Sequence, residues 1–152
     1  MQLSENTRSR PPVGFTVSAR PGPRTLDSLI TVAAEMALAD GEAHPAEHLG
    51  LLAFLRQDDT LARLGRRATL DRFAAALDGV AARRATGVHD APDLAETLRP
   101  MAGSHAARLV ARAAAHVAAA DGTLHPGELA LLRSLHATLG LTRGLTRVGQ
   151  PA

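Results

Sequence analysis

Hydrophobic positions in this chain recur every three or four residues from residue 25 onward, which is the period of an amphipathic helix. The first stripe begins at Leu26 and runs to Asp40, and Gly41 follows at the position where helices typically stop. Pro45 suits the first turn of a second helix, whose leucines continue the pattern toward Asp58. The first part of the chain therefore predicts two helices joined by a short turn.

The middle of the chain predicts two further helices. Asp59 is expected to cap a short arginine-rich helix that runs through Arg67. Thr69 is expected to cap a separate helix that carries the hydrophobic pattern to Val80. Residues 85–92 are expected to form a loop, because glycine and polar residues interrupt the pattern there.

Three more helices are predicted after this loop. The first is expected over residues 92–100, between two prolines. Ser104 caps a longer helix that runs to Asp121, and Pro126 begins the last helix, which stops at Gly140. No segment alternates with the period of two that a half-buried strand shows. The pattern therefore predicts an all-α bundle of about six or seven helices.

Length and composition indicate one helical domain with two tails. A chain of 152 residues with 45% hydrophobic and 21% charged residues fits a single soluble domain. Residues 1–24 contain prolines, glycines and arginines without a hydrophobic period, so they predict a flexible N-terminal tail. We expect the helical domain to span residues 25–142 and a flexible C-terminal tail to span residues 143–152.

The composition excludes several classes of function. Aromatic residues make up 2% of the chain, which disfavours both β-sandwiches and RNA recognition by base stacking. The 17 basic residues are all arginines and are opposed by 15 acidic residues, so the net charge is only +2 and no nucleic-acid partner is expected. The absence of cysteine removes disulfides, thiolate metal sites and thiol catalysis.

Neither a membrane span nor an enzyme is predicted. No apolar run approaches the roughly 18 residues of a membrane-spanning helix. The N-terminus lacks the hydrophobic core of a secretory signal, so the cytoplasm is the expected location. The sequence contains no nucleophile elbow, phosphate-binding glycine loop or His-Glu-x-x-His motif, and we therefore expect no catalytic residues.

One short pattern occurs twice in the chain. Residues 30–55 align with residues 111–136 with ten identities in 26 positions. Besides alanines, the copies share Asp40-Gly41 with Asp121-Gly122, His44-Pro45 with His125-Pro126, and Glu47 with Glu128. Each copy predicts an alanine-rich helix, a turn and a proline-initiated helix. We expect the two helical hairpins to pack about a pseudo-twofold axis, with small residues allowing close approach.

The two repeated aspartates require compensation. Asp40 and Asp121 end a predicted helix, where a carboxylate faces the negative end of the helix dipole. Each lies three residues past an alanine of the apolar stripe, so we expect the side chain to point inward. The compensating group is expected to be either the free N–H groups that begin the following helix or a bound cation.

The two repeated glutamates have two interpretations. With His44 and His125 at the N-cap, Glu47 and Glu128 occupy the third helical position, from which a carboxylate accepts a hydrogen bond from the N-cap N–H. This half of a capping box explains both acids without a ligand. Together with the aspartates and Glu42, the same glutamates also supply the clustered oxygens that bind hard cations such as Ca²⁺ or Mg²⁺.

Histidine and arginine groupings carry weaker signals. His44 and His48 have a spacing that suits Zn²⁺, but His44 is expected at the N-cap and no third ligand is identified, so we expect solvent-exposed histidines. A mixed histidine and carboxylate site with the intervening Glu47 is the alternative. An arginine cluster is expected to form a solvated face paired with nearby aspartates rather than a phosphate-binding surface. The cluster comprises Arg63, Arg66, Arg67 and Arg72, and the aspartates are Asp58, Asp59, Asp71 and Asp78.

The repeated segments resemble a known family. Residues 39–56 run from Ala-Asp-Gly-Glu to Leu-Leu-Ala-Phe-Leu-Arg, and residues 118–141 run from Ala-Ala-Ala-Asp-Gly-Thr-Leu-His-Pro-Gly-Glu to Leu-Gly-Leu. These two segments look like the paired signatures of the TerB-type tellurite-resistance domain, and residues 98–102 lie where that family has a connecting helix. The resemblance covers about residues 26–142.

The resemblance implies a compact all-helical domain with pseudo-twofold halves and a role in resistance to tellurite and other stresses. It implies no enzymatic activity, metal binding through the acidic loops, and action with membrane-associated partners of the TerC type, which would hold the protein at the inner face of the membrane. The acids that match the family's are Asp40, Glu42, Glu47, Asp121 and Glu128. The second loop departs from the family, because Thr123 and Gly127 stand where acids are expected, and His44 and His125 replace small caps.

Two hypotheses follow from these observations. The first is a non-enzymatic TerB-like domain that binds a divalent cation, with Ca²⁺ or Mg²⁺ favoured over Zn²⁺, and acts through a protein partner. The alternative is a metal-free helical interaction module whose acidic turns are only structural caps. The two differ in whether the acids of both turns converge in space without being fully neutralised by the fold.

Overall fold

The computed structural model describes residues 23–63, 65–87 and 91–142. These residues contain seven α-helices, one 3-10 helix and no strand, as the hydrophobic pattern predicts. The elements are α1 (Pro23–Ala37), α2 (Pro45–Arg56), α3 (Asp59–Ala62), α4 (Arg66–Ala85), α5 (Ala91–Leu98), the 3-10 helix η1 (Arg99–Met101), α6 (His105–Ala118) and α7 (Pro126–Thr138). No helix within these ranges has the length and apolar character needed to cross a membrane.

Both predicted tails lie largely outside the described residues. Residues 1–22 and 143–152 are not described, so the predictions for these segments stay predictions. Residues 23 and 24, which the sequence assigned to the N-terminal tail, belong to α1 instead. Pro23 begins the helix, and proline is well suited to a first helical position because its fixed φ angle matches the helix.

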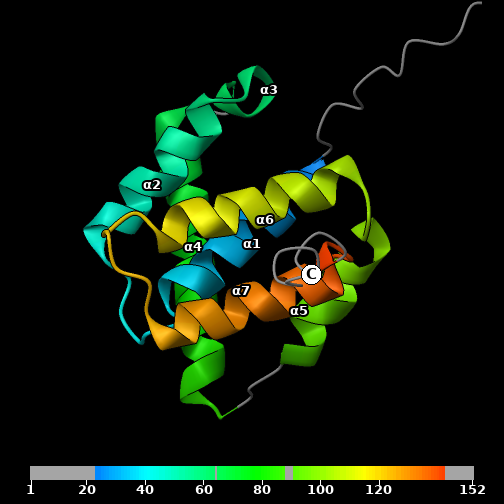
Figure 1. Ribbon diagram of the computed structural model, residues 1–152. Coiled ribbons are helices and arrows are strands. Elements are labelled where there is room, and N and C mark those ends of the chain that lie inside the picture. The colour runs from blue at the N-terminus through cyan, green and yellow to red at the C-terminus, as the bar shows by residue number, and fades with distance from the viewer. Residues whose placement is uncertain (1–22, 64, 88–90, 143–152) are drawn as a thin grey trace, which may run out of the picture.

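Helices α1 and α6 form the centre of the bundle (Figure 1). They are the first helices of the two repeats, and they pack against each other through small residues, which allow close approach of helix axes. The buried alanines on these two helices are Ala33, Ala34, Ala37, Ala107, Ala111, Ala113, Ala114 and Ala118. The alanine-rich composition therefore serves the contact between the two repeats.

The second helix of each repeat contacts the first helix of the other repeat. Helix α2 packs on α6, and the start of α7 lies on the end of α1. Helix α4 covers another side of α1, and α5 lies against α7 (Figure 1). The two hairpins thus interlock, and this arrangement brings the ends of all four helices toward each other.

Local sequence signals end and begin the helices of the repeats as predicted. Gly41 and Gly122 follow the two alanine-rich helices with φ angles of 110° and 82°, a region that glycine adopts without strain. Ser104 caps α6 because its hydroxyl oxygen accepts a hydrogen bond from the N–H of Ala107 at 3.1 Å.

The middle of the chain differs from the prediction. Helix α4 is one element of 20 residues, whereas the sequence predicted a separate helix starting at Thr69. Thr69 is buried within α4, and its hydroxyl donates a hydrogen bond to the carbonyl oxygen of Gly65 at 2.9 Å. A threonine can bond the preceding turn in this way inside a helix, so its capping preference does not decide the boundary. Phe73 and Val80 are both buried in the core and lie on the same continuous helix.

The short helix before α4 is also different from the prediction. Helix α3 ends at Ala62 rather than continuing through Arg67. The carboxylate of Asp58, and not that of Asp59, accepts the capping hydrogen bond, from the N–H of Leu61 at 3.2 Å. Gly65 then turns the chain with a φ angle of 79° before α4 begins.

The end of α4 holds the end of α1. Arg84 donates hydrogen bonds to the backbone carbonyl oxygens of Leu38 and Glu35, and to the Glu35 carboxylate at 3.2 Å. The last carbonyl groups of a helix lack partners within the helix and carry the negative end of its dipole. A cation that lies 46 residues further along the chain than Leu38 therefore caps α1, just before the first repeated turn.

Candidate functional site

The two repeated turns lie side by side at one end of the bundle (Figure 1). His125 of the second turn reaches the first turn, with its Nε2 3.7 Å from Oδ2 of Asp40. The same nitrogen lies 3.5 Å from Oδ2 of Asp121. The negative charges of both aspartates and of Glu128 raise the pKa of the buried Glu47. We refer to Asp40, Glu47, Asp121 and Glu128 as the acidic site.

The glutamates of the acidic site make the predicted capping hydrogen bonds. Oε2 of Glu47 accepts from the backbone N–H of His44 at 2.6 Å, and Oε2 of Glu128 accepts from that of His125 at 2.7 Å. Both glutamates are almost fully buried, with exposed fractions of 3% and 1%. Their structural role at the starts of α2 and α7 is therefore confirmed, and each carboxylate retains a second oxygen.

The aspartates are placed differently from the expectation. Both residues lie at the surface, and their side chains, which are 32% and 21% exposed, meet at Nε2 of His125 rather than in the core. Oδ1 of Asp40 accepts from the N–H of Glu42 at 3.3 Å, and Oδ1 of Asp121 accepts from the N–H of Thr123 at 2.9 Å. These donors belong to the turns and not to the following helices. The reason is that α1 and α6 end three residues before the aspartates, so helical periodicity no longer sets the direction of these side chains.

The two repeated histidines act differently although both are N-cap residues. Nδ1 of His44 accepts a hydrogen bond from the N–H of Ala46 at 3.2 Å and caps α2. The ring of His125 lies between the carboxylates of Asp40 and Asp121 instead. When this ring is protonated, it supplies a positive charge to both aspartates, a compensation that the sequence did not predict.

The pKa of Glu47 is raised from its ordinary 4.5 to about 7. Burial is the largest cause, because it penalises the charged carboxylate. The hydrogen bond from His44 opposes the shift, and the negative charges of Asp40, Glu128 and Asp121 add to it. The charged form of Glu47 is therefore disfavoured chiefly by burial, and the three neighbouring acids add to this effect.

The pKa of Asp121 moves in the other direction. The hydrogen bond from the N–H of Thr123 is the main cause of a lowered pKa, and His125 contributes further. Asp121 is therefore held in its charged form beside Glu47, whose charged form is disfavoured. The contrast arises because Asp121 is exposed and Glu47 is buried.

Glu42, the fifth predicted ligand, contacts the acidic site through its backbone. The backbone N–H of Glu42 donates a hydrogen bond to Oδ1 of Asp40, and Glu42 itself is exposed in the first turn. Within the described ranges, no group of three or more histidine, aspartate or glutamate side chains is arranged to hold a metal ion. The oxygens of the acidic site suit a hard cation in their chemistry, but one oxygen of each carboxylate accepts a backbone N–H and His125 lies between the aspartates.

The remaining histidine and arginine predictions are only partly met. His48 is half-buried and packs edge-on against Phe73 with ring centroids 4.9 Å apart, so it is neither an exposed histidine nor half of a zinc pair with His44. The arginine cluster is exposed, as predicted. Arg72, however, contacts Asp27 of α1 at 3.4 Å and not one of the predicted aspartates.

Two glycines bring the repeats together. A Cβ on Gly127 would lie 2.4 Å from the carbonyl oxygen of Ala39, and one on Gly50 would lie 2.7 Å from the Cβ of Ala120. The sequence interpretation treated Gly127 as a lost acid, whereas the structure shows that it lets the start of α7 touch the end of α1. The alignment of the repeats offered a signal, because each glycine stands opposite a residue with a side chain in the other copy. A glycine that interrupts a repeat inside a helix can mark a close approach of another segment.

Comparison with known proteins supports the resemblance noted in the sequence. The model of the family described as Tellurite resistance protein TerB matches residues 26–147, which include both repeated turns. No curated protein and no solved structure gives a significant match. Because the family match covers most of the chain and the fold is all-helical, the chain belongs to the TerB tellurite-resistance family.

Proposed function

We propose that this chain is a non-enzymatic TerB domain that binds a divalent cation at the acidic site and acts through a protein partner. The observation that carries the proposal is that His125 lies near an aspartate of each turn and that the charges of Asp40, Asp121 and Glu128 all act on the buried Glu47. The described side chains do not form a ready-made metal site, so these carboxylates would have to move closer together around the ion. A bound cation relieves the repulsion among such carboxylates, and oxygen clusters of this kind select hard cations. A part in tellurite resistance is proposed from the family match, and a part in other stresses from the resemblance of the sequence, because the chemistry of the site indicates neither.

The donor chemistry favours Ca²⁺ or Mg²⁺ over Zn²⁺. Asp40 and Asp121 would contribute the Oδ2 atoms that now face His125, and Glu47 and Glu128 would contribute the oxygens that do not cap helices. Binding requires the His125 ring to leave the space between the aspartates. The positive charge of the cation would attract carboxylates of both turns and so hold the turns together. The four carboxylates and the competing His125 ring would determine the affinity for the cation.

Calorimetric titration with Ca²⁺, Mg²⁺, Mn²⁺ and Zn²⁺ tests the cation proposal. We expect saturable binding of Ca²⁺ or Mg²⁺ to the wild-type protein and its loss in Asp40→Asn/Asp121→Asn. Asp71→Asn/Asp78→Asn on the exposed face of α4 makes the same change in net charge away from the site and should bind normally. Glu42→Gln shows whether Glu42 is a fifth ligand. No heat from any ion at millimolar concentration would contradict the proposal.

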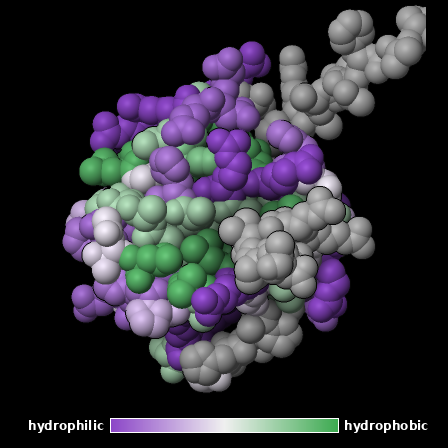
Figure 2. Space-filling view, viewed as in Figure 1, coloured by the Kyte–Doolittle hydropathy of each residue, from purple (hydrophilic) through white to green (hydrophobic). Residues whose placement is uncertain are grey.

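Exposed apolar side chains support a protein partner. Leu49 of α2 is 60% exposed beside a shallow groove that Pro45, Leu52 and Leu70 help to line, and Leu124 of the second turn is 49% exposed. Figure 2 shows hydrophobic residues exposed over α6 and α7 on the face in view, bordered by hydrophilic residues. Exposed apolar surface next to charged residues is typical of interaction sites.

A TerC-type membrane protein is the partner to test, since the family resemblance implies it. We expect binding of its cytoplasmic segments to strengthen when the cation is present and to weaken in Leu124→Asp, because Leu124 lies within the second turn beside Asp121. Leu49→Asp is the matched variant on α2. If partner binding changes neither with the cation nor in Leu124→Asp, the partner does not recognise the acidic site.

A metal-free interaction module is the second candidate function. It is favoured by the two glutamate caps and by the turn hydrogen bonds of the aspartates, which together give every acid of the site a structural role. In that case the titrations show no cation binding, and partner binding depends on the apolar side chains alone.

A further inference from the structure

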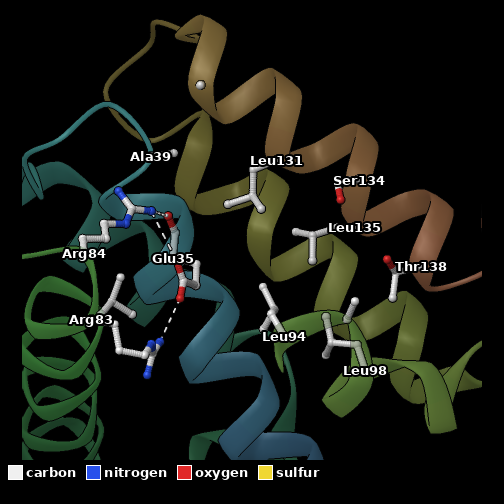
Figure 3. Close-up of a pocket in the computed structure, with 13 residues that line it drawn as sticks. Glu35, Ala39, Arg83, Arg84, Leu94, Leu98, Leu131, Ser134, Leu135 and Thr138 are labelled. Carbon is white, nitrogen blue, oxygen red and sulfur yellow. Dashed lines mark hydrogen bonds and ion pairs between the residues drawn. The ribbon is translucent and has the colours of Figure 1, made fainter. Parts of the chain in front are cut away.

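A pocket of about 370 Å³ lies between α7, α5 and the ends of α1 and α4 (Figure 3), and none of the four carboxylates of the acidic site lines it. Its walls are mainly aliphatic, and they are formed by Val80, Leu94, Leu98, Leu131 and Leu135. We propose that this pocket binds an amphiphilic monoanion, an aliphatic carboxylate whose chain lies on these walls and whose head group is bound by Arg83.

The pocket exists because the two repeats pack differently. In the first repeat Gly50 lets α2 lie directly on the end of α6 and on Ala120, which follows that helix. The residue of α7 that aligns with Gly50 is Leu131, which lines the pocket between α7 and α1 beyond the contact at Gly127. Protein interiors leave few voids larger than a water molecule, and small-molecule sites begin at about 300 Å³. The pocket is therefore large enough for a small ligand. Its lining of aliphatic side chains with a few charged groups is typical of small-molecule sites.

One end of the pocket carries a cluster of two arginines and one glutamate. Glu35 accepts hydrogen bonds from Arg83 at 2.8 Å and from Arg84 at 3.2 Å. Arg84 is committed to the end of α1, because it also bonds the carbonyl oxygens of Leu38 and Glu35. Arg83 donates to Glu35 alone in this cluster and is 46% exposed, so most of its five N–H donors can meet a ligand.

The charge of this cluster selects a monoanion. Two guanidinium groups and one carboxylate leave a net charge of +1, which a single carboxylate neutralises. A phosphate monoester carries close to two negative charges at neutral pH and is less well matched. The planar guanidinium of Arg83 also suits the planar carboxylate, with which it forms paired hydrogen bonds.

The position of the cluster relative to the leucines fits a ligand with a charged end and an apolar end. Figure 3 shows Leu94, Leu98, Leu131 and Leu135 facing the space across from Glu35 and the two arginines. A chain that extends from Arg83 over these leucines removes apolar surface of both ligand and protein from water. The affinity should therefore rise with chain length, and a head group without a chain should bind poorly.

Calorimetric titration with decanoate, acetate and decylammonium, in EDTA, tests the inference independently of any cation. Saturable binding of decanoate is expected, at least tenfold tighter than acetate and at least tenfold tighter than decylammonium. Acetate binding as tight as decanoate would remove the role of the leucines. Equal binding of decylammonium would remove the role of the arginine, and no decanoate binding at millimolar concentration would overturn the proposal.

Matched variants locate the ligand. Arg83→Gln is expected to weaken decanoate binding at least tenfold, whereas Arg133→Gln, which removes the same charge from an exposed position on α7, should leave it unchanged. Leu131→Trp fills the space and should abolish binding in a protein that otherwise has no tryptophan, with circular dichroism as the check on folding. Equal effects of the two arginine variants would place the ligand elsewhere, whether or not Leu131→Trp folds.

Discussion

The two helical hairpins of this TerB domain share a sequence pattern but close against their neighbours differently. In α2 the glycine is the sixth residue, and it lets the helix lie close to the end of α6 and to Ala120 just beyond it. In α7 the glycine is the second residue, so the helix touches the end of α1 near its start and then stands away from it. The different positions of the glycine within the two helices thus accompany a closed interface in one repeat and a pocket in the other.

The hairpins also divide the chemistry of the acidic site unequally. His44 caps its own helix, whereas His125 lies between two aspartates that belong to different turns. The two glutamates are both buried caps. A duplicated sequence therefore does not give duplicated roles, because each copy meets different neighbours in the folded chain.

Gly127→Ala tests the tighter of the two glycine contacts and has the largest expected effect. The added Cβ would meet the carbonyl oxygen of Ala39 at 2.4 Å, and a backbone atom cannot rotate away. We expect the free energy of unfolding to fall by about 3 kcal/mol, near the top of the usual range for overpacking. Urea denaturation at pH 7 measures it.

Gly50→Ala is the matched variant in the other hairpin. Its Cβ would meet the Cβ of Ala120 at 2.7 Å, and the gain in helix propensity offsets part of the clash. We expect a loss of about 1–2 kcal/mol that Ala120→Gly partly restores in the double variant. A loss as large as that of Gly127→Ala would show that the two contacts are equally tight.

The pH dependence of stability tests the burial of Glu47. Its pKa is about 7 in the folded protein and 4.5 in the unfolded chain, so the folded state binds the proton more strongly. This contribution is fully present below pH 4.5 and is lost as the pH rises through 7, by about 2–3 kcal/mol. Unfolding measured in EDTA between pH 4.5 and 8.5 should show the decline.

Two variants assign this decline to its source. Glu47→Gln keeps a capping oxygen but removes the charge, so the decline should disappear, whereas the aligned Glu128→Gln should retain most of it. The lowered pKa of Asp121 acts in a separate window, because its contribution is present above pH 3.8 and is lost as the pH falls below that value. A decline that survives Glu47→Gln would contradict the assignment.

Arg84→Gln tests the capping of α1 beside the open interface. The variant removes hydrogen bonds to two helix-end carbonyl oxygens and to Glu35, and we expect a loss of about 1–2 kcal/mol. Arg83→Gln removes one more exposed ion pair and should cost less than about 0.5 kcal/mol. Thermal or urea unfolding distinguishes them, and equal losses would mean that the carbonyl contacts do not stabilise α1.

The histidine pair is expected to give the smallest difference. His44→Ala removes a side-chain cap and should cost about 0.5–1 kcal/mol, and His44→Asn should restore it because asparagine is a strong N-cap. His125→Ala should cost less than about 0.5 kcal/mol, because its ring makes no capping hydrogen bond to α7 and its contacts with the aspartates are at the surface. A greater cost at His125 than at His44 would show that the contacts of this ring with the aspartates stabilise the turns more than the cap does.

The sequence alone determined the helices of the repeats and the glutamate caps. Alanine-rich stripes, Asp-Gly stops and proline starts are local signals, and they act over a few residues wherever they occur. Glu47 and Glu128 were predicted as caps because the capping box depends only on the spacing to the N-cap residue. Thr69 misled the prediction, since a threonine can cap a helix or bond the turn before it.

Only the tertiary structure decided how the copies differ. The placement of His125 between Asp40 and Asp121, the raised pKa of Glu47 and the cap that Arg84 provides for α1 all join residues far apart in the chain. The roles of Gly127 and Gly50 depend on which atom lies opposite them, Ala39 in one case and Ala120 in the other. Local spacing cannot specify these contacts, because burial and charge depend on every element packed around a residue.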